Sequence, residues 1–248
     1  MAPRVVVLSL ASDFGCQVQL TNMEDHLLEV LGLMDLSYWQ LASSGHMPAA
    51  YDVAIVEGAV TTGEHVEFLK DVRSKAAAVI AIGACANTGG IPALARGGDL
   101  EGRYASVYGT GGVAVAPGRL APAPVGSVIA VDYHVPGCPI DQGEFLRVLS
   151  RVLLGLSDRI PDGTMCASCK VNENVCFYES GTVCLGLVTR SGCGAKCPTL
   201  GRPCAGCRGV APDANLASAR DVLARYGCDE GCLTSALRVY NTAEEVLV

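Results

Sequence analysis

Apolar residues along the first 156 positions occur in two arrangements, short continuous runs and longer stretches with helical spacing. Continuous apolar runs are typical of strands covered on both faces, as in a parallel sheet. Such runs, together with one more mixed segment at 35–41, predict strands at 5–10, 35–41, 53–56, 77–82 and 128–131. Apolar positions three and four residues apart predict helices at 17–31, 64–74 and 142–156. Strands that alternate with helices indicate an α/β fold, and we expect a flavodoxin-like, doubly wound parallel sheet.

The pattern changes beyond position 157, where regular apolar spacing disappears until about Leu216. Cysteines fill this gap, and eight of the 13 in the chain lie between Cys166 and Cys207. One C-x-x-C motif opens the block and another closes it. Thiolates at these spacings converge on a small inorganic core, so the block indicates two metal sites with four cysteines each.

Two domains are therefore expected. The first, residues 1–156, is the flavodoxin-like domain, and the second, residues 157–248, is a cysteine-rich, mostly irregular or helical iron–sulfur domain. Residues 217–247 predict one or two helices at its end. Because residues 157–216 have little apolar patterning, we expect bound metal to hold this segment together. Residues 86–126, rich in glycine, alanine and proline, have no predicted placement.

Composition narrows the range of partners and compartments. Half of the 248 residues are apolar and 17% are charged, which suggests that part of the surface is buried against another protein. A net charge of −7 argues against nucleic acid as a partner. No apolar window approaches 18 residues, so we expect no membrane span. The chain shows no secretory signal, and we expect a cytoplasmic protein whose reduced thiols are metal ligands rather than disulfides.

Three further cysteines follow predicted strands. Cys16, Cys85 and Cys138 each lie in a glycine- or proline-rich turn just beyond a strand. Ligands of open α/β sheets bind beyond the carboxyl ends of the strands, so these thiols converge if the strands are neighbours. The alternative is that they are small buried apolar residues. Cys228 and Cys232, on the predicted terminal helices, are expected to be ordinary thiols.

The type of metal is open from spacing alone. Structural zinc suits paired C-x-x-C motifs, but two zinc sites leave Cys16, Cys85 and Cys138 without a role. Iron–sulfur clusters take four ligands each and accept irregular spacings from separate loops. The short run from Cys193 to Pro198 also resembles ferredoxin-type ligation. Iron–sulfur clusters are the favoured interpretation.

Several motifs also resemble a known family. In the first part of the chain they are GCQVQ at 15–19, NMED at 22–25, VEGAV at 56–60, IGACA at 82–86 and PGCP at 136–139. The most specific is the block at 184–198 with its continuation at 201–207. Together these stretches resemble the small, electron-transfer subunit of [NiFe] hydrogenases, in the cytoplasmic group that includes the sulfhydrogenase delta subunits. The matches extend from the first strand almost to the C-terminus.

The resemblance implies three [4Fe-4S] clusters in a row, named here by their distance from the catalytic partner. The implied ligands are, for the proximal set, Asp13, Cys16, Cys85 and Cys138; for the medial set, Cys193, Cys197, Cys204 and Cys207; and for the distal set, Cys166, Cys169, Cys176 and Cys184. Asp13 is a departure, because the family motif has a cysteine there. A carboxylate is a harder ligand than a thiolate but keeps the charge. The alternative is that Asp13 is a helix N-terminal residue beside a three-cysteine cluster.

Glu57 ends a predicted strand near the proximal set, where it either relays protons or hydrogen-bonds the surroundings of the cluster, or is an ordinary strand-end carboxylate. The resemblance implies an oxidoreductase in which the nickel–iron centre belongs to a separate large subunit. Electrons are expected to pass through the three clusters to a diaphorase-type flavin or iron–sulfur partner that reduces NAD(P) or a similar acceptor. The departure at Asp13 keeps a second hypothesis open, an iron–sulfur wiring subunit of a hydrogenase-derived complex without hydrogenase activity.

Overall fold

Five parallel strands form the central sheet of the computed structural model, which describes residues 2–109, 118–228 and 230–243. Their order across the sheet is β2 (Asp35–Trp39), β1 (Arg4–Ser9), β3 (Val53–Glu57), β5 (Ala78–Ile82) and β7 (Tyr133–Val135). All neighbouring pairs are parallel. Counted along the chain, this is the 2-1-3-4-5 order of flavodoxin-like sheets. The predicted α/β, doubly wound fold is confirmed.

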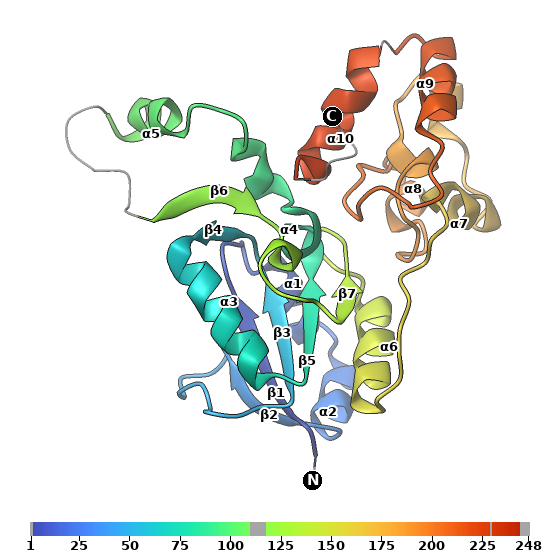
Figure 1. Ribbon diagram of the computed structural model, residues 1–248. Coiled ribbons are helices and arrows are strands. Elements are labelled where there is room, and N and C mark those ends of the chain that lie inside the picture. The colour runs from blue at the N-terminus through green and yellow to red at the C-terminus, as the bar shows by residue number, and fades with distance from the viewer. Residues whose placement is uncertain (1, 110–117, 229, 244–248) are drawn as a thin grey trace.

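Each face of the sheet carries its own apolar core. Val5 and Val7 of β1 point to one core, and Val6 and Leu8 point to the other. This alternation is the two-residue period of a strand buried on both sides. The first core is covered by α1 (Gly15–Thr21), α2 (Asp25–Leu31) and α6 (Gln142–Leu153), and the second by α3 (Gly63–Lys75) (Figure 1).

Two of the predicted elements differ in the structure. The helix expected at 17–31 is divided into α1 and α2, because Glu24 adopts a positive φ of 44° between them. The strand expected at 128–131 is instead an irregular segment, whose Ile129 is buried in the second core. The sheet pairing falls further along, where Tyr133 and Val135 of β7 lie beside Ile80 and Ile82. An apolar run alone does not distinguish a segment buried as a paired strand from one buried in irregular structure.

The segment at 86–126 contains elements that the sequence did not place. Its described residues form the end of α4 (Gly83–Thr88), α5 (Leu100–Tyr108), β6 (Arg119–Ala123) and the short 3₁₀ turns η1 (Ile91–Ala95) and η2 (Val125–Ser127). β6 pairs antiparallel with β4 (Val60–Thr62), away from the main sheet (Figure 1). Residues 110–117 of this segment lie outside the described residues.

The cysteine-rich part consists of short helices and turns, and two longer helices follow it. The elements are α7 (Met165–Val171), η3 (Phe177–Ser180), η4 (Leu185–Leu187), α8 (Lys196–Thr199), α9 (Leu216–Arg225) and α10 (Glu230–Asn241). Leu223 of α9 and Leu237 of α10 pack with Leu185 and Val188 in a third apolar core. The last two helices therefore add apolar side chains to those that the cysteine-rich segment contributes to this core. Positions 244–247 of the predicted terminal helices lie outside the described residues.

Membrane crossing requires a helix of about 20 apolar residues. Among the helices in the described ranges, none has both the length and the apolar character for this. α6, one of the longest, instead has the alternation of a helix lying on a sheet, with Phe145 and Leu149 buried in the first core.

Candidate metal centres

Cys16, Cys85 and Cys138 lie together at the carboxyl edge of the sheet. They follow β1, β5 and β7 and line one cavity of about 570 Å³ with Asp13 and Glu57. The approach is close: a Cβ atom added to Gly83, which has a φ of 81°, would lie 2.5 Å from the Cys16 sulfur. Only glycine satisfies both conditions at this position. The sheet therefore brings together thiols that are 69 and 53 positions apart in sequence.

Glu57 and Asp13 contact this group in different ways. Glu57 is 2% exposed, and its Oε1 accepts a hydrogen bond of 3.0 Å from the backbone N–H of Cys16. Burial raises the pKa of Glu57, and hydrogen bonds from Cys16 and Gln17 oppose that shift. Asp13 is exposed, and its Oδ1 accepts a hydrogen bond of 2.9 Å from the backbone N–H of Gly15 at the start of α1. Asp13 thus lines the cavity and also bonds the first turn of the helix, so both interpretations of this residue remain predictions.

The eight cysteines of the C-terminal block divide into two groups of four, each around its own cavity. The first cavity, of about 100 Å³, is lined by Cys193, Cys197, Cys204 and Cys207. The second, of about 50 Å³, is lined by Cys166, Cys169, Cys176 and Cys184. Pro198 lines both cavities, so the two groups are neighbours. This is the division of the cysteines that the resemblance implies.

Successive ligand groups are in direct contact. Cys138, which lines the cavity at the sheet edge with Cys16 and Cys85, also lines the medial cavity beside Cys207. The N–H of Cys204 donates to the sulfur of Cys184 at 3.2 Å, which links the medial cavity to the distal one. The three groups therefore lie in a row with direct contacts between successive members. Sequence spacing alone does not predict these contacts.

The buried cysteines are better suited to bind a positively charged metal core than to exist as free thiolates. Burial is the main cause that raises the pKa of Cys85, Cys166 and Cys207 to about 11 and that of Cys204 to about 12. Neighbouring cysteines raise these pKa values further. A metal core supplies the compensating charge that buried thiolates need. Among the residues that the structure describes, no three His, Cys, Asp or Glu side chains are grouped tightly enough to hold a single metal ion.

Arg208 connects the medial cysteines to the sheet, and sequence reasoning missed it. Arg208 and Glu144 are 2% and 5% exposed, and their side chains form a bidentate pair with N–O distances of 2.6 and 2.7 Å. The same guanidinium donates to the carbonyl of Pro136 at 2.7 Å and to that of Ser191 at 3.0 Å. Because Arg208 follows Cys207 and Pro136 lies two residues before Cys138, this pair fixes the two ligand loops against each other. No local pattern marks a contact between residues 64 positions apart.

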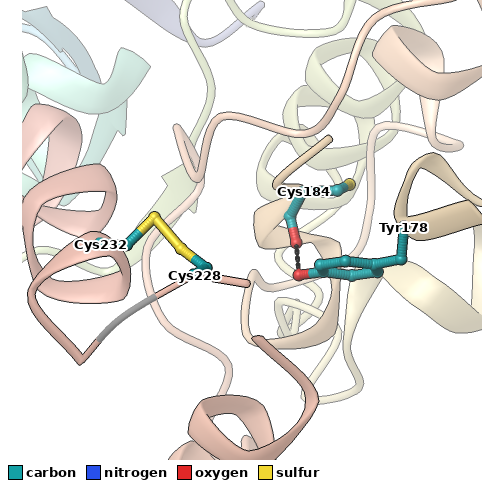
Figure 2. Close-up of a disulfide and its surroundings, with 4 residues drawn as sticks. All are labelled: Tyr178, Cys184, Cys228 and Cys232. Carbon is teal, nitrogen blue, oxygen red and sulfur yellow. Dashed lines mark hydrogen bonds between the residues drawn. A yellow bond between two sulfur atoms is a disulfide. The ribbon is translucent and has the colours of Figure 1, made fainter. Parts of the chain in front are cut away.

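Cys228 and Cys232 are paired in the structure, which corrects the expectation that they are ordinary thiols. They form a disulfide across the turn between α9 and α10 (Figure 2). Cys228 is 9% exposed and packs in the third apolar core with Tyr178, whose hydroxyl donates to the carbonyl of Cys184 at 2.5 Å. The remaining cysteines in the described part of the chain are free. Cys228 lies in the turn before α10 and Cys232 lies near the start of that helix, and a spacing of four residues alone does not distinguish this pairing from two separate thiols.

The chain shows similarity to known proteins over most of its length. Residues 14–152 match the family described as NADH ubiquinone oxidoreductase, 20 Kd subunit. The sulfhydrogenase 2 subunit delta of Pyrococcus furiosus is 35% identical, with 90% of this chain and 93% of that protein covered. A subunit of the F420-non-reducing hydrogenase vhu of Methanocaldococcus jannaschii is 33% identical, with 92% and 89% covered. A chain of an NAD+-reducing [NiFe]-hydrogenase crystal structure superposes with a TM-score of 0.55 at 27% identity, covering 65% of this chain and 96% of that one.

Proposed function

This chain belongs to the NADH ubiquinone oxidoreductase 20 kDa subunit family, as a small subunit of the [NiFe] hydrogenase type, and we propose that it relays electrons through three [4Fe-4S] clusters. The observation that supports the relay is the row of three cysteine-lined cavities, of which the first two share Cys138 and the last two are joined by the hydrogen bond from the N–H of Cys204 to the sulfur of Cys184. A [4Fe-4S] cluster supplies one-electron redox chemistry. The chain belongs to an oxidoreductase whose nickel–iron centre is in a separate large subunit.

The proposed ligands are those that line the three cavities. Asp13, Cys16, Cys85 and Cys138 hold the proximal cluster, Cys193, Cys197, Cys204 and Cys207 the medial one, and Cys166, Cys169, Cys176 and Cys184 the distal one. Glu57 orients the turn of Cys16 through its backbone hydrogen bond. Because its carboxylate is buried in the same cavity wall, Glu57 is also placed to hold a proton beside the proximal set. The sheet domain at 1–156 then carries the proximal set, and the domain at 157–248 carries the other two.

In the proposed reaction, the large subunit converts H2 into two protons and two electrons. The residues of this chain bind the clusters, keep them in a row and exclude water from the buried thiols. Electrons leave through the distal set toward a flavin or iron–sulfur partner of the diaphorase type. NAD(P) is the acceptor proposed here, because a structural relative is named as an NAD+-reducing hydrogenase. We propose a cytoplasmic location for the complex, as expected for a soluble acceptor.

Metal content and hydrogen-dependent activity of the purified complex test this function. We expect about twelve iron atoms per small subunit, nickel in the large subunit and hydrogen-dependent reduction of a dye. The aspartate at position 13, where the family motif has a cysteine, supports one competing function. In that function the chain is an electron-transfer subunit of a related complex that has lost hydrogenase activity. That function predicts the same iron content without nickel and without reduction of the dye by hydrogen.

Asp13→Ala is expected to change one cluster and leave two unchanged. If the Asp13 carboxylate binds iron, its removal alters the ligand field of the proximal cluster alone. The measurement is EPR of the reduced complex, wild type against variant. Asp141→Ala is the matched control, because Asp141 caps the N-terminus of α6 through Glu144 N–H without lining the proximal cavity. Three unchanged EPR signals in Asp13→Ala contradict ligation and leave only the role of Asp13 at the start of α1.

A further inference from the structure

The end of α10 reaches the point where the proximal and medial ligand sets meet. Tyr240 lines the medial cavity together with Cys138 and Cys207. Burial raises the pKa of the Cys138 thiol, and the neighbouring Tyr240 hydroxyl, acting as a hydrogen-bond donor, opposes that shift. A metal-bound thiolate has no proton to donate, so the hydroxyl is the donor in this contact. Nothing in the cysteine spacing indicates that a tyrosine more than 100 positions from Cys138 lies there.

Tyr240 and the residue after it are hydrogen-bonded to two different parts of the chain. Its backbone carbonyl accepts a hydrogen bond of 2.6 Å from the hydroxyl of Thr88, at the end of α4, the helix that carries Cys85. The next residue, Asn241, is fully buried and donates to the carbonyl of Gly206 at 3.2 Å, within the loop from Cys204 to Cys207. One helix end is therefore bonded to a proximal ligand element and to a medial ligand loop. Such support restricts the position of the tyrosine ring.

We propose that Tyr240 is a positioning residue for the electron step between the proximal and medial clusters, and that its hydroxyl sets the reduction potential of the proximal cluster through Cys138. The inference rests on the proposed function, because it takes Cys138 as an iron ligand. A hydrogen bond to a cluster sulfur stabilises the reduced form, which carries more negative charge. Cys138 also lines the medial cavity beside Cys207. Tyr240 thus acts on the residue that joins the two sets.

Tyr240→Phe in the purified hydrogenase complex tests the inference. Removing the hydroxyl is expected to make the proximal cluster harder to reduce, so that its EPR signal appears at a more negative potential in a redox titration. A tenfold change in the one-electron equilibrium corresponds to a shift of about 59 mV. The medial and distal midpoints are expected to stay within error of the wild type. Tyr178→Phe is the matched control, because its hydroxyl bonds the carbonyl of Cys184 and no sulfur.

A second variant covers the case in which Tyr240→Phe does not assemble. Thr88→Val keeps the ring and removes the hydroxyl that fixes the Tyr240 backbone, so a smaller shift in the same direction is expected. An unchanged proximal midpoint in the variant that assembles, or equal shifts in all three signals, would overturn the inference. Those outcomes leave the wild-type iron content and reduction by hydrogen intact. A wild-type complex without hydrogen-reducible clusters instead contradicts the proposed function itself.

Discussion

Glu144→Leu is expected to lower the free energy of unfolding by about 3–5 kcal/mol, because it leaves the buried Arg208 guanidinium without its counter-charge. The two side chains are almost fully removed from solvent, so water does not replace the lost carboxylate. Three of the guanidinium's hydrogen bonds to backbone carbonyls remain, but these carbonyls carry no net charge. The measurement is urea denaturation of the anaerobically purified chain, followed by circular dichroism.

Two controls separate a buried charge effect from a simple loss of contacts. The double variant Glu144→Leu with Arg208→Met replaces the pair by apolar side chains and is expected to recover most of the lost stability. Glu67→Gln removes one partner of an exposed pair, in which the Glu67 side chain is 74% exposed, and is expected to change stability by about 0.5 kcal/mol or less. A loss below about 1 kcal/mol in the single variant contradicts the burial of this pair.

The position of this ion pair in the chain gives it a role beyond stability. Glu144 lies on α6, which packs on the sheet, and Arg208 follows the last cysteine of the medial set. The pair and the Cys138 to Cys207 contact join the same two loops. A chain that loses the pair therefore loses a constraint on the spacing between the proximal and medial sets. The proposed electron step depends on that spacing.

The sheet was predictable because its signal is local. The run at 53–56 is apolar at every position because both faces of β3 are covered, and that pattern is present within four residues. The placement of Cys16, Cys85 and Cys138 at one edge then followed from the general rule for parallel sheets. The strand prediction for 128–131 was wrong because apolar residues can be buried equally well in an irregular segment. The break at Glu24 carries neither glycine nor proline, so no local signal marks it.

For the site, only the grouping of the cysteines was predictable, and their role as ligands stays a proposal. Motif spacing and family resemblance divided the cysteines into groups, and the structure gathers each group around a cavity. The residues that connect one ligand set to the next are single side chains from distant parts of the chain, such as Arg208, Tyr240 and Thr88. Each makes its contact through tertiary packing, and none belongs to a repeated spacing. A contact of this kind becomes visible only when the fold is known.

Cys207→Ala is expected to remove about four iron atoms per chain and to stop hydrogen-dependent dye reduction at the distal end. Cys207 is placed to bind the proposed medial cluster and lies beside Cys138 in the same cavity, so its loss is expected to interrupt the row at the centre. The proposed proximal ligands lie in the other part of the chain and are unchanged in this variant. Brief exposure of the variant complex to hydrogen should therefore reduce the proximal EPR signal and leave the distal one oxidised. Iron analysis and freeze-quench EPR measure both effects.

The double variant Cys228→Ala with Cys232→Ala is the matched control for thiol loss. These two cysteines are bonded to each other and lie outside the three ligand sets, so the variant is expected to keep about twelve iron atoms and to reduce the distal cluster with hydrogen. Full iron content in Cys207→Ala contradicts the medial ligand set. Loss of four iron atoms with normal reduction of the distal cluster contradicts something different, the order of the row, because electrons then reach the distal set without the medial one. The two measurements together therefore test the ligands and the path separately.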